Sequence, residues 1–363
     1  MPVTHNTKSS FRFGVEIELL LESPNRKHKT WHSLAMDISK RLAKAGIPNR
    51  VDNSGDYSEW SIVREVTVQD PNGKNPYQYG IELVSPIHTA TATSLPTLTK
   101  TLTQLFTTLT PTTTIIPTPR CSSHIHISRS TSNPLSPTDL AALAKAALYF
   151  EHALDTLMPP ERRTNSPHAH WTQSNRHVHN PVLAGLSLQA CLAKIDAAAG
   201  GGGGGVGGAV MGVGGGSGGG GDAARAVVEV MNLVAKESRY GVVRGKRADF
   251  VRGKTCKWDF SGFLAATTAT GGGEVVDRGI AGTVEFRQPP GSVRAEDVLV
   301  WVTLAVVFVA GAVEVGMGLG VGGDVKQEGG SLEELWGLLM KGREVVGWAD
   351  LDVLEGLFMG VGR

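Results

Sequence analysis

The segment FRFGVEIELLL, residues 11–21, constrains the fold of this chain more than any other. Apolar residues occupy both faces of its two-residue period, and the only acidic interruptions are Glu16 and Glu18. This pattern is typical of a central strand in a sheet that carries a polar pair on one face. Two like charges in so apolar a strand repel each other and lose hydration unless a cation lies between them. The segment therefore predicts a buried strand whose carboxylates face a positive charge.

Two further strand-like segments carry polar pairs at the same spacing. CSSHIHIS contains His124 and His126, and GTVEFRQPPGS contains Glu285 and Arg287. Side chains two residues apart lie on the same face of a strand, about 6.5 to 7 Å apart. For any one such pair, a solvated face of an antiparallel sheet is the more common explanation. The repetition of the pattern in three strands is what favours a shared site.

Three more glutamates lie in or near strand-like segments. Glu82 interrupts the apolar segment GIELVSPI, and Glu59 and Glu65 lie in EWSIVREVTV, the segment before it. If these strands are neighbours, one face of the sheet gathers at least four carboxylates, two histidines and an arginine. Mg²⁺ suits such oxygen-rich ligation, and phosphates bridged by the metal would take its remaining positions.

Four motifs in this order, FGVEIE, GIELVSP, HIHIS and GTVEFRQPPGS, resemble those of the amidoligase family. The segments MPPERRTN and KWDFSGF are also similar to family segments, so the resemblance runs from about residue 11 to 310 without the glycine tract. The family belongs to the carboxylate–amine ligases, with the catalytic fold of glutamine synthetase and glutamate–cysteine ligase. The resemblance implies an α+β fold: a curved, mostly antiparallel sheet with ATP and divalent metals on its concave face and helices packed outside.

The resemblance also implies which residues bind two Mg²⁺ or Mn²⁺ ions. The implied ligands of the ion that holds the γ-phosphate of ATP are Glu16, His124 and Glu285. The implied ligands of the second ion are Glu18 and Glu82, with Glu65 or Glu59 as a third.

The implied reaction is ATP-dependent amide-bond formation through an acyl phosphate. Arg287 and Glu285 would be catalytic, with Arg287 neutralising the transferring phosphoryl group, and His126 would contact ATP phosphate. Arg162 and Arg163 could bind a substrate carboxylate, although a solvated helix end explains them equally well. The partners implied are a small-molecule or peptide carboxylate and an amine.

The sequence departs from the family pattern at several positions. Serines precede the first histidine where glycine is common, Glu65 stands for an expected aspartate, and Asp259 stands for an expected asparagine. A catalytically degenerate relative that binds nucleotide or peptide is therefore an alternative. A zinc hydrolase using His124 and His126 is a further one, since the segment 168–179 offers more histidines. Those histidines are His168, His170, His177 and His179.

We expect a single catalytic domain over residues 11–315, after a disordered N-terminus at 1–10. The nearly continuous glycine tract at 199–221 cannot offset its ordering entropy and is interpreted as a disordered insertion. Residues 316–363 should form a glycine-rich loop and helices packed on the same domain. Helical periodicity predicts the other helices: 31–47, 94–109, 136–158, 183–198 and 222–237.

Composition excludes several classes of protein. The net charge of +1 gives no reason to expect a nucleic-acid or anionic-membrane partner. Three scattered cysteines and the absence of a hydrophobic leader in MPVTHNTKSS suggest a reducing, cytoplasmic location.

The apolar run Val298 to Val313 has 16 residues. It is shorter than the roughly 20 residues that span a bilayer, so we expect a buried helix and no membrane. The oligomeric state cannot be read from the sequence.

Overall fold

The structure is a computed structural model. It describes residues 11–52, 57–68, 75–130, 132–164, 166, 171–176, 180–200, 219–233, 242–243, 246–247, 253–263, 282–318 and 325–360.

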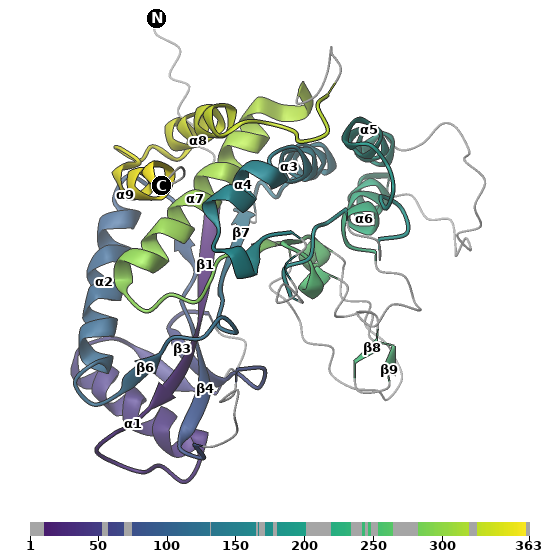
Figure 1. The fold of residues 1–363 in the computed structure, drawn as a ribbon. Coiled ribbons are helices and arrows are strands. Elements are labelled where there is room, and N and C mark those ends of the chain that lie inside the picture. The colour runs from purple at the N-terminus through teal and green to yellow at the C-terminus, as the bar shows by residue number, and fades with distance from the viewer. Residues whose placement is uncertain are drawn as a thin grey trace, which may run out of the picture.

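A mostly antiparallel sheet forms the centre of the molecule (Figure 1). Its main path runs β10-β11-β7-β1-β4-β3-β2, and only β2 and β3 pair in parallel. The strands are Trp258–Asp259 (β10), Val284–Phe286 (β11), Ser123–Arg129 (β7), Phe11–Glu22 (β1), Gln78–Val84 (β4), Trp60–Arg64 (β3) and Asn49–Val51 (β2). The sheet does not close on itself. The predicted α+β class with a mostly antiparallel sheet is therefore confirmed.

β1 is long enough to pair with two strands along each edge. One edge pairs with β4 and then with the short β5, His88–Thr89. The other edge pairs with β7 along residues 11–17 and with β6, Thr114–Ile116, along residues 20–22. The chain between β6 and β7 thus leaves the ladder beside Glu18.

The two faces of β1 differ in chemistry. Phe13, Val15, Ile17 and Leu19 point to one face and are buried in the main hydrophobic core. That core includes buried residues of α1 (Trp31–Lys44), α2 (Ser94–Leu109) and α7 (Ala295–Val315). Because side chains alternate along a strand, Glu16 and Glu18 point to the opposite face. Burial of the apolar face against helices therefore fixes the direction of both carboxylates.

The buried helix expected in the apolar C-terminal run is α7. It is the one helix in the described part of the chain that is long and apolar enough to cross a membrane, by length and composition only. Of its most apolar 18-residue window, 78% is buried inside the protein. It packs against β1 and β7 on one side and against α8, Leu332–Val346, which lies beside it in Figure 1.

The close approach of α7 and α8 depends on glycine. A Cβ atom at Gly342 would collide with the backbone carbonyl of Val307, whereas a Cβ at Gly337 on the same helix would meet nothing within 4 Å. We expect Gly342→Ala to lower the free energy of unfolding by about 1–3 kcal/mol through overpacking. Gly337→Ala, the matched control, should be neutral or stabilising by up to about 1 kcal/mol, because alanine favours the helix. Urea unfolding of both variants tests this, and equal stabilities would contradict the close packing.

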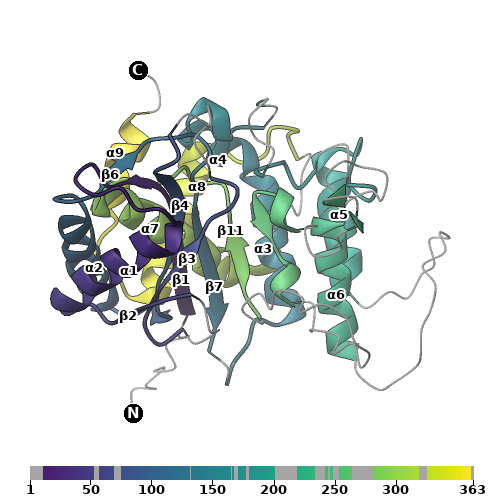
Figure 2. The same ribbon diagram turned by 90° about the horizontal axis from the view of Figure 1, so that it is seen from below.

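The remaining helices differ from expectation mainly at their boundaries. The helix expected at 136–158 is divided at Phe150 into α3, Pro137–Tyr149, and α4, Glu151–Leu157. α3 begins within one residue of the predicted start, and Ser136 caps it. The helices flanking the glycine tract are α5, Leu188–Ala199, and α6, Gly219–Asn232, which lie side by side in Figure 2. The insertion expected at 199–221 is therefore too wide, because α5 includes residue 199 and α6 includes residues 219–221. Residues 201–218, like residues 1–10, lie outside the described part of the chain.

Shorter elements complete the described structure. The C-terminal helix α9 spans Asp352–Met359, so α8 and α9 both lie in the segment 316–363 where helices were expected. β8, Val242–Val243, and β9, Lys246–Arg247, form a separate pair. Short 3-10 helices lie at Pro160–Arg162, Gly253–Thr255, Ser261–Phe263 and Gly316–Gly318.

Candidate active site

The register of the sheet brings the polar pairs of β1, β7 and β11, together with Glu82 of β4, onto one face. Glu16 lies opposite His124, and Glu18 lies opposite Glu82. His126 in turn lies opposite Glu285. Directly opposed residues of antiparallel strands share a face, with Cβ atoms about 4.5–5.5 Å apart. The residues expected to form a shared site are therefore neighbours in the structure.

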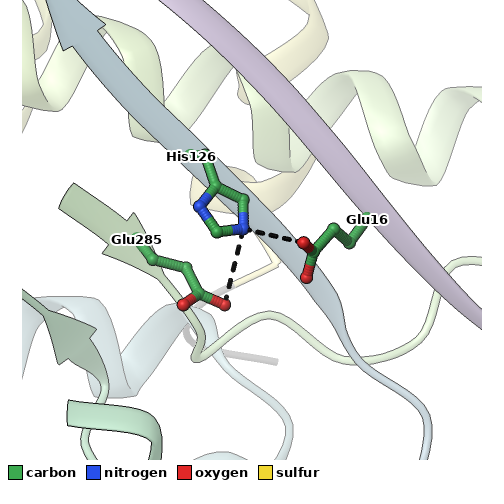
Figure 3. A group of neighbouring side chains, drawn as sticks. All are labelled: Glu16, His126 and Glu285. Carbon is green, nitrogen blue, oxygen red and sulfur yellow. Dashed lines mark ion pairs between the residues drawn. The ribbon is translucent and has the colours of Figure 1, made fainter. Parts of the chain in front are cut away.

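The two histidines of β7 contact carboxylates from the strands on both sides. His126 Nε2 lies 3.1 Å from Glu16 Oε1 and 3.7 Å from Glu285 Oε1 (Figure 3). His124 Nδ1 lies 3.3 Å from a carboxylate oxygen of each of the same two residues. His124 Nε2 also lies 3.8 Å from Glu18 Oε1. We call the face that carries Glu16, Glu18, Glu82 and Glu285 the acidic face. His124 lies between Glu18 towards one end of it and Glu285 at the other.

Three groups of side chains in the described residues place their ligand atoms within 4.8 Å of one another. They are Glu16, His126 and Glu285; Glu16, Glu82 and His124; and Glu18, Glu65 and Glu82. Glu16 links the first two groups and Glu82 links the last two. The third group has the composition expected for the second metal ion. Glu16 and Glu285 are grouped with His126, and His124 Nδ1 is also near both carboxylates, so the expected set of Glu16, His124 and Glu285 stays a prediction.

Glu59, the other candidate for the second ion, lies elsewhere. Its carboxylate forms an ion pair of 2.6 Å with Arg50. Glu65 follows the end of β3 and accepts hydrogen bonds from the backbone N–H and the hydroxyl of Thr67. The structure therefore favours Glu65 over Glu59 as the third carboxylate.

Burial and crowding of like charges disfavour the ionised form of two of these carboxyl groups. Burial raises the pKa of Glu82, and the nearby carboxylates of Glu16, Glu18 and Glu65 raise it further, to well above its usual value. Burial also raises the pKa of Glu18. His124, Arg287 and Arg162 lower the pKa of Glu18, but burial outweighs them.

The other end of the acidic face is balanced by histidine. Burial would lower the pKa of His126, but the carboxylates of Glu16 and Glu285 outweigh burial and raise it to about 9. Burial would raise the pKa of Glu16, but His126 and His124 hold it well below its usual value. Neither ring nitrogen of His126 has a hydrogen bond of good geometry within the described structure.

These residues fit divalent cations. Most of the donors are carboxylate oxygens, which suit Mg²⁺ and Mn²⁺. A cation would relieve the repulsion that raises the pKa of Glu82. The fit is closest at Glu18, Glu65 and Glu82, where three carboxylates meet.

Arg287 lies at the β11 end of the same face. It is 8% exposed, and its guanidinium forms an ion pair with Glu285. Burial would lower its pKa, but Glu285 and Asp259, followed by Glu18 and Glu16, raise it. Its Nε atom is buried without a hydrogen-bond partner in the described structure. A permanent positive charge with an unused donor therefore faces the carboxylates.

Arg162 does not reach the acidic face directly. Its buried guanidinium donates to Ser122 Oγ at 2.9 Å and to the carbonyl oxygens of Pro119 and Cys121. The Ser122 N–H in turn donates to Glu18 Oε2 at 2.7 Å. These contacts position the loop beside Glu18, and the substrate contact expected of Arg162 stays a prediction.

Arg163 is exposed, and its Nε donates to the Met158 carbonyl at 2.8 Å. Its expected contact with a substrate carboxylate stays a prediction. The serines that replace glycine before His124 cause no clash, since both Ser122 and Ser123 are buried and hydrogen-bonded.

Two features of the site were not predicted from the sequence. Asp259 lies opposite Glu285 on the same face, and burial together with Glu285 raises its pKa. Just before β10, Lys257 Nζ contacts Asp155 at 2.5 Å, and Gln288 donates to the same carboxylate at 2.6 Å. The alternation of KWDF could have indicated Asp259. No local pattern indicates the Lys257 cluster, because its members are distant in sequence.

The zinc hydrolase hypothesis depended on further histidines. His168, His170, His177 and His179 lie outside the described residues. Within the described groups, each histidine is joined by two carboxylates. The hypothesis therefore stays untested.

An open α+β sheet that carries carboxylates, histidines and an arginine on one face suits enzymes that handle metal-bound phosphates. Residues 9–178 match a family model described as a putative amidoligase enzyme. The match covers less than half of the chain, and over these residues it confirms the resemblance drawn from the motifs. A search of curated proteins gives no match. The matched part includes β1, β4 and β7 but ends before β11, which provides Glu285 and Arg287.

Proposed function

We propose that this chain is an ATP-dependent carboxylate–amine ligase that acts through an acyl phosphate. The observation that carries the proposal is the shared face of β1, β4, β7 and β11, where carboxylates and histidines form linked groups beside Arg287. The family match supports amide-bond formation in general. The groups on this face supply what phosphoryl transfer to a carboxylate requires.

In the proposed first step, the carboxylate of the acid attacks the γ-phosphorus of ATP, and ADP leaves. Negative charge builds up on the phosphoryl oxygens during this transfer, and fixed positive charges aimed at those oxygens accelerate it. Arg287 supplies such a charge, and Glu285 holds its guanidinium in place through their ion pair. His126, whose pKa of about 9 keeps it protonated at neutral pH, donates a hydrogen bond to a phosphate oxygen.

In the second step, the nitrogen of the amine attacks the carbonyl carbon of the acyl phosphate, and phosphate leaves as the amide forms. The residues that would hold the metal ions are Glu16, His124 and Glu285 at one end, and Glu18, Glu65 and Glu82 at the other. When bound, such ions neutralise phosphate charge and orient the phosphate groups. The chain contributes the rigid sheet that fixes these side chains.

The proposal is tested by measuring ADP release with Mg²⁺ across pairs of carboxylic acids and amines. We expect at least one pair to release ADP only when both compounds are present, and Glu16→Ala to abolish that release. Glu22→Ala, at the end of the same strand, is a control outside the three metal groups. ADP release that Glu16→Ala leaves unchanged would refute the proposal.

Metal binding should also be visible in stability. Folded Glu82 has a raised pKa, so the metal-free protein loses stability as the pH rises from the ordinary carboxyl range toward that raised value. We expect Glu82→Gln to be more stable than the parent without metal, by a margin that grows over this pH range. We also expect Mn²⁺ to raise the melting temperature of the parent more than that of the variant. Thermal unfolding with and without Mn²⁺ checks both, and equal Mn²⁺ shifts would contradict the role of Glu82.

A further inference from the structure

A pocket of about 550 Å³ adjoins the acidic face at Glu18. Its walls are residues 18–20 of β1, residues 115–119 and 121, Glu161, and residues 290–293. It lies where the chain between β6 and β7 leaves the edge of β1. Leu20 points to the same face as Glu18, because the two are separated by two positions on the strand. The pocket therefore continues the acidic face beyond the group Glu18, Glu65 and Glu82.

The walls of this pocket are mainly apolar. Leu20, Cys121 and Ile116 belong to a small hydrophobic cluster that is separate from the main core. Prolines at 117, 119 and 290 add further apolar surface. A pocket of this size and character can enclose the body of a small organic molecule.

The charged side chains in the pocket lining are both acidic, Glu18 and Glu161. Glu18 is already engaged, since it accepts a hydrogen bond from the Ser122 N–H and belongs to a metal group. Glu161 is half-buried and has no hydrogen bond or ion pair in the part of the chain that the structure describes. The Arg162 guanidinium binds the carbonyl oxygens of Pro119 and Cys121 and does not line the pocket. Glu161 is therefore the carboxylate available to a ligand.

An acidic group in an otherwise apolar pocket selects for a cation with an apolar body and against a carboxylate. We propose that this pocket binds the amine substrate, that this substrate is an amine with an aliphatic or aromatic body, and that Glu161 pairs with its ammonium group. The inference rests on the proposed ligase function, because it assigns one of the two substrates to a place beside the metal group of Glu18. It concerns binding of the amine before the amide bond forms.

The test is binding of hexylamine, hexanol and hexanoate to the full chain, measured by titration calorimetry or ligand-observed NMR. We expect hexylamine to bind more tightly than hexanol, and hexanoate to bind least. Glu161→Gln should weaken the binding of hexylamine at least about tenfold, because a charge-assisted hydrogen bond is lost, and should leave the binding of hexanol unchanged. Val293→Trp, at a lining residue that is 36% exposed, should weaken the binding of hexylamine and of hexanol by filling the pocket. Glu344→Gln on the exposed face of α8 is the matched control and should leave both affinities unchanged.

Binding of ATP with Mg²⁺ to the parent and to Glu161→Gln separates this inference from the proposed function. Glu161 lies outside the three metal groups, so nucleotide binding should be the same in both proteins. No hexylamine binding, hexanoate binding as tight as that of hexylamine, or an unchanged affinity in Glu161→Gln would overturn the pocket assignment, whatever ATP does. Absence of ATP binding in the parent would instead refute the ligase proposal, and the three-ligand comparison would still decide what the pocket binds.

Discussion

Arg287→Ala is expected to reduce ATP-dependent ligation by about a thousandfold or more. Arginines that stabilise a transferring phosphoryl group contribute about 10³–10⁵ to the rate, and Arg287 is buried with one donor nitrogen unpartnered among the carboxylates. The loss should fall on the turnover rate, because the charge acts on the transition state. Steady-state kinetics of ADP release measures it.

Two control variants separate this effect from misfolding. Arg287→Lys keeps the charge next to Glu285 and should fold like the parent, but it loses the planar guanidinium and should recover only part of the rate. Arg26→Ala removes an exposed arginine whose only role in the described structure is an ion pair with Asp37, and it should retain full activity. A normal rate in Arg287→Ala would show that the arginine serves only as the partner of Glu285.

Lys257→Met is expected to lower the free energy of unfolding by about 3–5 kcal/mol, the usual cost of breaking a buried ion pair on one side. Its ammonium group contacts Asp155 and Thr164, each at 2.5 Å, and its side chain is 1% exposed. Asp155 is itself only 11% exposed and would keep an uncompensated charge. The Lys257 carbonyl also accepts the backbone N–H of Arg287 at 2.8 Å, so the change should disturb the active-site face as well.

Lys145→Met provides the matched comparison. Lys145 is equally buried, but its partner Asp196 is 45% exposed and can regain water when the lysine is removed. We therefore expect a clearly smaller loss of stability in Lys145→Met. Chemical unfolding of both variants decides this, and equal losses would show that burial of the partner does not set the cost.

The strands that carry the site were predictable because their signal is local. A polar pair two positions apart in an apolar segment predicts both the strand and the face, as at Glu16 and Glu18. The register of the sheet then brings Glu82, His124 and Glu285 to that face, and the motif order alone indicated that these strands are neighbours.

The features that were missed depend on contacts distant in sequence. The Lys257–Asp155 pair joins residues 102 positions apart, and neither residue lies in a pattern that predicts the other. In the sequence, Arg162 follows a helix and has the position of a solvated residue at the helix end. In the structure its buried guanidinium donates to Ser122 Oγ, 40 positions away in the sequence. The break at Phe150 between α3 and α4 has no proline or glycine to indicate it.

The central claim is that the acidic face transfers the γ-phosphoryl group of ATP to a carboxylate. Its most direct test is the use of an acid labelled with ¹⁸O in its carboxylate, taken from the pair that supports ADP release. The account predicts that one ¹⁸O atom appears in the released phosphate for each amide formed, since the acyl phosphate loses that oxygen to phosphate. Amide formation that leaves all ¹⁸O in the acid and amide would contradict the account.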